Sequence, residues 1–121
     1  MNLTWNWLTL RVRDLEASIA FYNGVLGLPV DRRFESRGRL IAMLGTAEQP
    51  KIELIQGGDV NVRPGSGISV GFEVESLDAA MAELADRGIP IARGPVSPNP
   101  RLRFLYVLDP DGFEVQLAQH L

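Results

Sequence analysis

LTLRVRDLEASIAFY, residues 8–22, and VGFEVESLDAAMAEL, residues 70–84, are two copies of one pattern. In each copy alternating apolar residues lead to a polar helix-capping residue, Asp14 or Ser76, which is followed by apolar residues at helical spacing. A glycine and a hydrophobic-Pro-hydrophobic step come after each copy, in 27–30 and 88–91. The repeat predicts one strand and helix unit used twice, with equivalent strands converging on a pseudo-twofold cleft.

Short strands are predicted after each helix, because apolar and β-branched runs alternate with turn residues. In the first half they are Val30–Glu35, Arg39–Leu44 and Lys51–Gln56. In the second half strands are expected at Ile68–Val74, before the helix, and at Ile89–Ala92, Arg103–Leu108 and Glu114–Ala118. The predicted fold class is α+β, with two tandem βαβββ modules forming a curved mixed sheet around a cleft.

The chain length of 121 residues fits a single domain over 1–121. Module one is expected over about 5–56 and module two over about 68–118, joined by a glycine-rich connector at 57–67. A net charge of −3 without a basic run argues against a nucleic-acid partner. The chain has no cysteine and no apolar run long enough to span a membrane, so we expect no membrane partner and a cytoplasmic location.

Two motifs identify a family resemblance. VxDLxxSIxFY begins at Val12 and is followed by VLGL at Val25, and LDPDGxxxxL begins at Leu108. In this order they resemble the vicinal oxygen chelate superfamily, which includes glyoxalase I, extradiol dioxygenases, fosfomycin-resistance enzymes and bleomycin-resistance proteins. The resemblance covers nearly the whole chain and implies the paired βαβββ fold and a homodimer.

The resemblance also implies where metal ligands would stand. The first-strand histidine falls on Trp7 and its repeat equivalent on Ser69, while the glutamate of the last strand falls on Gln116. Only Glu53 matches a ligand of the glyoxalase type. A divalent site needs three or more suitable protein ligands, so we predict no metal and no other cofactor.

Strand alternation predicts which side chains line the cleft. Trp7, in place of a ligand histidine, offers a flat indole that could stack on a planar organic molecule, or it could fill the cavity as ordinary core. The predicted ligand-binding residues are Trp7, Thr9, Arg11, Glu53, Ser69, Glu73, Arg103 and Gln116.

Several of these residues have alternative interpretations. Arg11 and Glu73 stand at equivalent repeat positions and could form an ion pair with each other. The proline-rich segment 94–103 could close over the cavity and offer Asn99, Arg101 or Arg103, or it could be a surface turn.

Further charged residues are interpreted from their sequence setting. Glu53 and Glu114 could form an acid-base couple. Arg32, Arg33, Arg37 and Arg39 are interpreted as solvated strand edges, and His120, near the chain end, as a solvated surface group.

The predicted function is binding of a small, planar organic ligand in a metal-free pocket, in a sequestering role like that of bleomycin-resistance proteins. One alternative is a metal-dependent lyase or isomerase of the glyoxalase type with a non-standard site. Another is an accessory or dimerisation domain whose cavity is filled. No catalytic residue is assigned, and the residues at the implied metal positions favour a binding protein over an enzyme.

Overall fold

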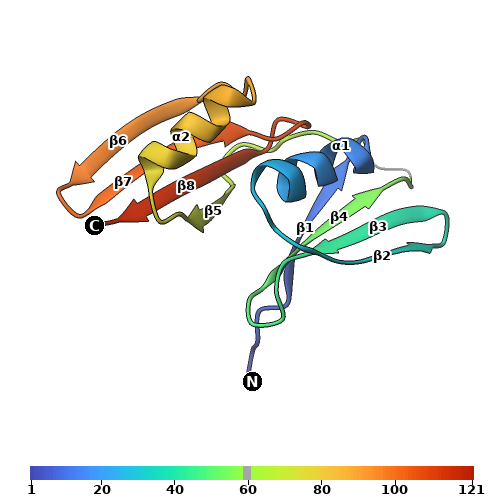
Figure 1. Cartoon of the computed structure of the whole chain (residues 1–121). Helices are drawn as coiled ribbons and strands as arrows, with labels where there is room; N and C mark the ends of the chain where they lie inside the picture. Colours follow the sequence, from blue (N-terminus) through green and yellow to red (C-terminus); the bar gives the residue numbers. More distant parts are fainter. Residues whose placement is uncertain (59–60) are drawn as a thin grey trace. The chain divides into compact units, whose positions relative to one another are not determined.

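The structure, a computed structural model, describes residues 1–58 and 61–121. The chain forms two compact units, Met1–Arg63 and Pro64–Leu121 (Figure 1). Their boundary lies within the predicted connector 57–67. That both units belong to one domain, and that they enclose a cleft, stay predictions.

The first unit is a βαβββ module. Its elements are β1 (Trp7–Val12), α1 (Leu15–Ile19), the π-helix η1 (Ala20–Val25), β2 (Val30–Ser36), β3 (Arg39–Leu44) and β4 (Lys51–Gln56). The strands form a mixed sheet in the order β1-β4-β3-β2, in which β1 runs parallel to β4 and the other neighbours are antiparallel.

The second unit repeats this topology. Its elements are β5 (Ser69–Glu73), α2 (Leu77–Asp86), β6 (Arg93–Asn99), β7 (Leu102–Leu108) and β8 (Glu114–His120). The sheet order is β5-β8-β7-β6, with β5 parallel to β8. The predicted α+β class with two βαβββ modules is therefore confirmed.

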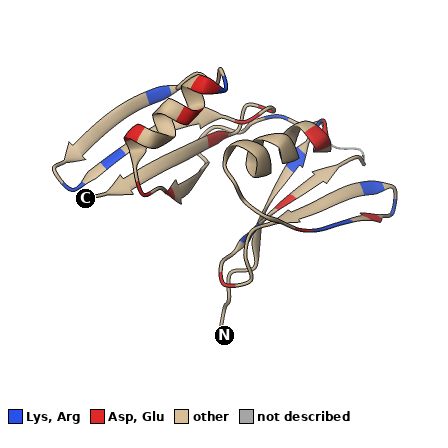
Figure 2. Ribbon diagram, in the orientation of Figure 1, with Lys and Arg blue, Asp and Glu red and all other residues tan. Residues whose placement is uncertain are grey.

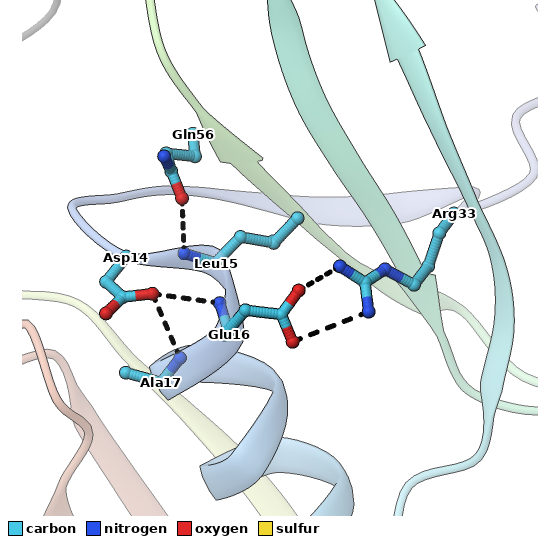
Figure 3. A network of polar contacts seen from close by, with 6 residues as sticks. All are labelled: Asp14, Leu15, Glu16, Ala17, Arg33 and Gln56. Carbon is cyan, nitrogen blue, oxygen red and sulfur yellow. Dashed lines mark hydrogen bonds and ion pairs between the residues drawn. The ribbon is translucent and has the colours of Figure 1, made fainter.

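Both helices begin as predicted at a side-chain cap. Asp14 Oδ1 accepts hydrogen bonds from the backbone nitrogens of Glu16 and Ala17 at 3.0 and 3.3 Å (Figure 3). Ser76 Oγ accepts one from Ala79 N at 3.1 Å. These bonds satisfy amides that have no partner within the helix.

A glutamine in the last strand of each module completes the helix start. The amide oxygen of Gln56 accepts a hydrogen bond from Leu15 N at 2.6 Å, and that of Gln119 accepts one from Leu77 N at 2.7 Å. The two glutamines occupy equivalent repeat positions. Each ties its helix to the strand that closes the module.

The first helix differs from the prediction. The apolar spacing after Asp14 predicts a continuous α-helix, whereas α1 has five residues and continues as η1. Leu26 N donates to Phe21 O, an i to i+5 bond of the π type. The adjacent rings of Phe21 and Tyr22 are both buried here and meet edge to face at 5.1 Å, so tertiary packing accompanies the wider turn.

The strand predicted at Ile89–Ala92 is wrong, as is the loop at 94–103. The structure has β6 over Arg93–Asn99, with an irregular register against β7. This strand is at the edge of its sheet. An edge strand tolerates Pro95 and Pro98 because their missing N–H groups need no partner on the open side.

Each sheet packs one face against its helix. In the first unit this face carries Leu10, Val12, Leu44 and Leu54, and in the second Leu105, Val107, Val115 and Leu117, all of them buried. Basic and acidic residues are interspersed over the ribbon of both units (Figure 2). None of the helices among residues 1–58 and 61–121 has the length and apolar character to cross a membrane.

Candidate ligand-binding site

The open face of the first sheet, opposite α1, carries most of the predicted site residues of this unit. Trp7, Thr9 and Arg11 alternate along β1 with the buried helix-facing residues. Thr9 stands opposite Glu53 on β4, and Glu53 stands opposite Met43 on β3. The sheet therefore brings β1, β4 and β3 side chains into one row.

Thr9 and Glu53 are directly bonded. Thr9 Oγ1 donates a hydrogen bond to Glu53 Oε1 at 2.6 Å in a partly buried setting. A hydrogen bond from a hydroxyl to a carboxylate oxygen fixes the rotamer of the carboxylate side chain. Glu53 is thus held in place by its neighbour on the sheet.

Arg11 lies two positions further along β1. Its Nη1 atom is buried and has no hydrogen-bond partner among the described residues. Its neighbour across the strands is Ile55, which belongs to a buried apolar cluster with Ile41 and Met43. A buried donor without a partner is costly, so this atom is a candidate for contact with a ligand.

A cavity of about 520 Å³ opens at the start of β1. Its apolar wall includes Trp5, Trp7 and Met43. These two tryptophans are the only ones in the chain, and both keep exposed surface, 71% of Trp5 and 49% of Trp7. Of the predicted site residues in this unit, Trp7 lines the cavity, whereas Thr9, Arg11 and Glu53 continue the same sheet face beyond it.

The charged part of the wall consists of Asp31, Arg32, Glu48 and Lys51. Lys51 Nζ donates to Thr46 O at 3.1 Å and lies 4.0 Å from an oxygen of Asp31. The guanidinium of Arg32 stands 4.9 Å from the centroid of the Phe34 ring. The cavity therefore combines aromatic surface with two cations and two carboxylates.

Arg32 is a wall residue that the sequence interpretation missed. Val30 pairs with Leu44, but the register shifts by one between Val30 and Arg32, so Arg32 pairs with Met43 and Arg33 with Ala42. A one-residue shift moves following side chains to the opposite face of the sheet. Arg33 accordingly forms an ion pair with Glu16 of α1 (Figure 3), while Arg32 turns to the cavity.

The second unit has a polar row at the equivalent positions. Gln116 on β8 stands between Gly71 on β5 and Tyr106 on β7. Gln116 Nε2 donates to the Tyr106 hydroxyl at 3.2 Å, and Gly71 leaves space for the amide oxygen, which lies 3.1 Å from where a Cβ would be. The Gln116 amide is thereby fixed in orientation.

The tyrosine of this row carries a cation on its ring. The guanidinium of Arg93 stands 4.0 Å from the centroid of Tyr106 and forms a 2.5 Å ion pair with Glu114. Glu114 stands opposite the predicted site residue Ser69, which is exposed. Because Glu114 holds Arg93, the interpretation of Glu114 as half of an acid-base couple gains no support.

Glu73 and Arg103 have partners within the second unit. Glu73 accepts from His120 N at 2.8 Å and meets His120 Nδ1 at 2.7 Å. These hydrogen bonds, the backbone one first, lower the pKa of Glu73. Arg103 is not offered by a loop: it lies in β7 and forms an ion pair with Asp78 of α2 at 3.1 Å, on the helix side of the sheet.

The residues at the four implied metal positions do not fit a divalent ion. Trp7 and Ser69 offer no strong ligand, Glu53 is bonded to Thr9, and Gln116 is a neutral amide bonded to Tyr106. Within residues 1–58 and 61–121 no three His, Cys, Asp or Glu side chains gather into a metal-binding group.

A comparison with protein families matches residues 4–117 to the family described as Glyoxalase/Bleomycin resistance protein/Dioxygenase superfamily. A comparison with curated protein sequences gives no match.

Solved structures share the fold over almost the whole chain. Glyoxalase I of Leishmania major, described as trypanothione-dependent, is 23% identical with a TM-score of 0.83, and the alignment covers 98% of this chain and 87% of that one. A glyoxalase family protein from Bacillus cereus is 22% identical with a TM-score of 0.82, and the alignment covers 100% of this chain and 96% of that one. TnmS3, an antibiotic binding protein from Streptomyces sp. CB03234, is 20% identical with a TM-score of 0.78, and the alignment covers 99% of this chain and 98% of that one. At these identities the likeness establishes the fold alone.

Proposed function

Because the chain belongs to the glyoxalase/bleomycin resistance protein/dioxygenase superfamily, we propose that it binds a small, planar organic ligand in the cavity of its first unit, without a metal ion. The observation that carries this proposal is the position of the chain's two tryptophans, Trp5 and Trp7, on the wall of one cavity. Large exposed aromatic side chains in a concave site are typical of ligand recognition.

The size and lining of the cavity support this proposal. Its volume of about 520 Å³ falls in the range of small-molecule sites, about 300 to 1,000 Å³. Met43 adds a polarisable side chain that adapts to flat rings. Charged side chains of the wall, Arg32 and Lys51 among them, supply polar groups that orient a ligand.

Binding without chemistry is the form of the proposal that the side chains favour. Glu53, the one carboxylate at an implied metal position, is engaged by Thr9, and among the described residues it belongs to no group of three His, Cys, Asp or Glu side chains that could hold a metal ion. TnmS3, which shares the fold, is named an antibiotic binding protein. We extend a binding role to the present chain and propose that it sequesters its ligand.

Intrinsic fluorescence tests the proposal selectively, because every tryptophan of the protein lines the cavity. Planar compounds are titrated into the protein, beginning with N-phenyl-1-naphthylamine, whose own fluorescence also rises in apolar sites. We expect saturable binding of one molecule per chain. Trp7→Ala should weaken it about tenfold or more, equivalent to about 1.4 kcal/mol, and Trp7→Phe should weaken it less.

The matched control is Leu108→Ala, which removes an apolar side chain of the second unit with the same exposed fraction, 49%, as Trp7. Dye binding that persists in Trp7→Ala, or that is lost equally in Leu108→Ala, would place the ligand elsewhere and contradict the proposal.

A further inference from the structure

We infer that the ligand of this cavity carries an acidic group and that Arg32 is the residue that binds it. This inference rests on the proposed function and adds the chemical class of the ligand. The acidic group is a carboxylate, sulfonate or phosphonate attached to the planar ring system. The argument compares Arg32 with its counterpart in the second module.

Arg32 and Arg93 occupy equivalent positions. In the first module, Arg32 is the strand partner of Met43, and Met43 is the strand partner of Glu53. In the second module, Arg93, Tyr106 and Gln116 form the same row across the strands. Each arginine also lies over an aromatic ring, that of Phe34 at 4.9 Å and that of Tyr106 at 4.0 Å. The two modules therefore present a guanidinium at the same place on the open face of their sheets.

The two arginines differ in whether a carboxylate neutralises the charge of the guanidinium. Arg93 is held by Glu114 at 2.5 Å. Glu114 is the strand partner of Ser69, and Lys51 is the strand partner of Trp7, which is the repeat equivalent of Ser69. Glu114 and Lys51 therefore occupy equivalent positions. This position carries a carboxylate in the second module and a lysine in the first. In the part of the chain that the structure describes, Arg32 forms no ion pair.

Neither carboxylate of the wall, Asp31 or Glu48, forms an ion pair with Arg32 among the described residues. Lys51 is near Asp31 and donates to Thr46 O, so its charge is partly compensated. The planar guanidinium has five N–H donors in a fork that matches two oxygens of one acidic group. Contact with Phe34 supports the guanidinium from one side and leaves its edges free to donate.

Trp7 and Arg32 together define the recognised molecule. Both line one cavity, in which the indole offers a stacking surface and the guanidinium a charged anchor. A planar ring bearing an anionic oxygen group uses both. A neutral ring uses the indole alone, so the difference in affinity between two such molecules measures the role of Arg32.

Two dyes with the same ring system make this measurement. 1-Anilinonaphthalene-8-sulfonate and N-phenyl-1-naphthylamine differ by one sulfonate, and both fluoresce on binding to apolar sites. We expect Arg32→Gln to weaken the sulfonate dye about tenfold, as for loss of a charge-assisted hydrogen bond, and to leave the neutral dye unchanged. Arg32→Lys, which keeps the charge, should lose less.

Arg33→Gln is the matched control, because Arg33 is the next residue on the same strand but faces α1. Equal weakening in the two arginine variants would indicate a general charge effect and overturn the inference. So would an unchanged sulfonate dye in Arg32→Gln, or weakening of both dyes. If neither dye binds the unmodified protein, the proposed function itself fails and the inference with it.

Discussion

The amide oxygen of Gln56, at the end of β4, accepts a 2.6 Å hydrogen bond from the backbone nitrogen of Leu15, the first residue of α1. Gln119 and Leu77 form the same bond at 2.7 Å in the second module. The bond joins the last strand of a module to the start of its helix in a partly buried setting, where an unpaired amide is costly.

Gln56→Ala should therefore lower the free energy of unfolding by about 1 to 3 kcal/mol. Gln119→Ala should have a similar effect because its bond is equivalent. Urea unfolding followed by circular dichroism measures both. Gln49→Ala, at an exposed glutamine of the first unit, is the control; losses no larger than its own would show that the amide bonds contribute little.

The Glu73 and His120 pair predicts a pH dependence of stability. Hydrogen bonds from the backbone and the ring of His120 lower the pKa of Glu73 below its ordinary value of 4.5. Since the folded-state pKa is the lower one, the pair stabilises the fold above about pH 4.5 and this contribution is lost as the pH falls through the folded-state pKa.

Glu73→Gln should therefore reduce stability at pH 6 to 7 and bring the variant closer to the unmodified protein as the pH falls toward about 3. Thermal unfolding across this range measures the difference. Glu75→Gln, at an exposed carboxylate two residues away, is the control. A difference between Glu73→Gln and the unmodified protein that does not change with pH would contradict this role for the pair.

Gly71 predicts a steric effect in the polar row of the second module. A Cβ at this position would lie 3.1 Å from the Gln116 amide oxygen, so Gly71→Ala must displace an amide that is bonded to Tyr106. We expect a loss of about 1 kcal/mol in stability. Gly65→Ala, where a Cβ meets nothing within 4 Å, should not be destabilising.

A double variant checks the cause of this loss. In a Gln116→Ala background the clash is absent, so Gly71→Ala should cost less there than in the unmodified protein. Equal costs in both backgrounds would show that the loss comes from the backbone of β5 and not from Gln116.

Divalent metal ions should leave the melting temperature unchanged. A ligand that binds only the folded state raises the melting temperature by mass action, but the implied metal positions carry one carboxylate, Glu53, with an indole, a hydroxyl and an amide. Thermal unfolding with Ni²⁺, Zn²⁺ or Mn²⁺, on protein free of any affinity tag, checks this. A rise of several degrees in the melting temperature that is absent in Glu53→Ala would show that Glu53 binds a metal ion together with residues outside the implied positions.

Much of the fold follows from local patterns. Period-2 alternation in β1 correctly separates Leu10 and Val12 from Thr9 and Arg11, and the caps Asp14 and Ser76 mark both helix starts. Such patterns are local because a strand or a helix turn imposes its own period on the side chains.

Two elements did not follow from local patterns. The π-helix η1 occurs where the buried rings of Phe21 and Tyr22 pack edge to face, and β6 lies at a sheet edge, where Pro95 and Pro98 are tolerated. Neither condition is visible in the residues themselves, since each is set by what lies beside the segment in the folded chain.

The sequence by itself determined the repeated βαβββ topology and the presence of an aromatic residue, Trp7, at a position where the family resemblance implies a metal ligand. Only the tertiary structure decided that Arg32 faces the cavity and Arg33 the helix, because a bulge between Val30 and Arg32 shifts the register. Two adjacent arginines are equivalent in a sequence. Their faces are assigned by pairing with β3, and a pairing register is a long-range property that one extra residue reverses.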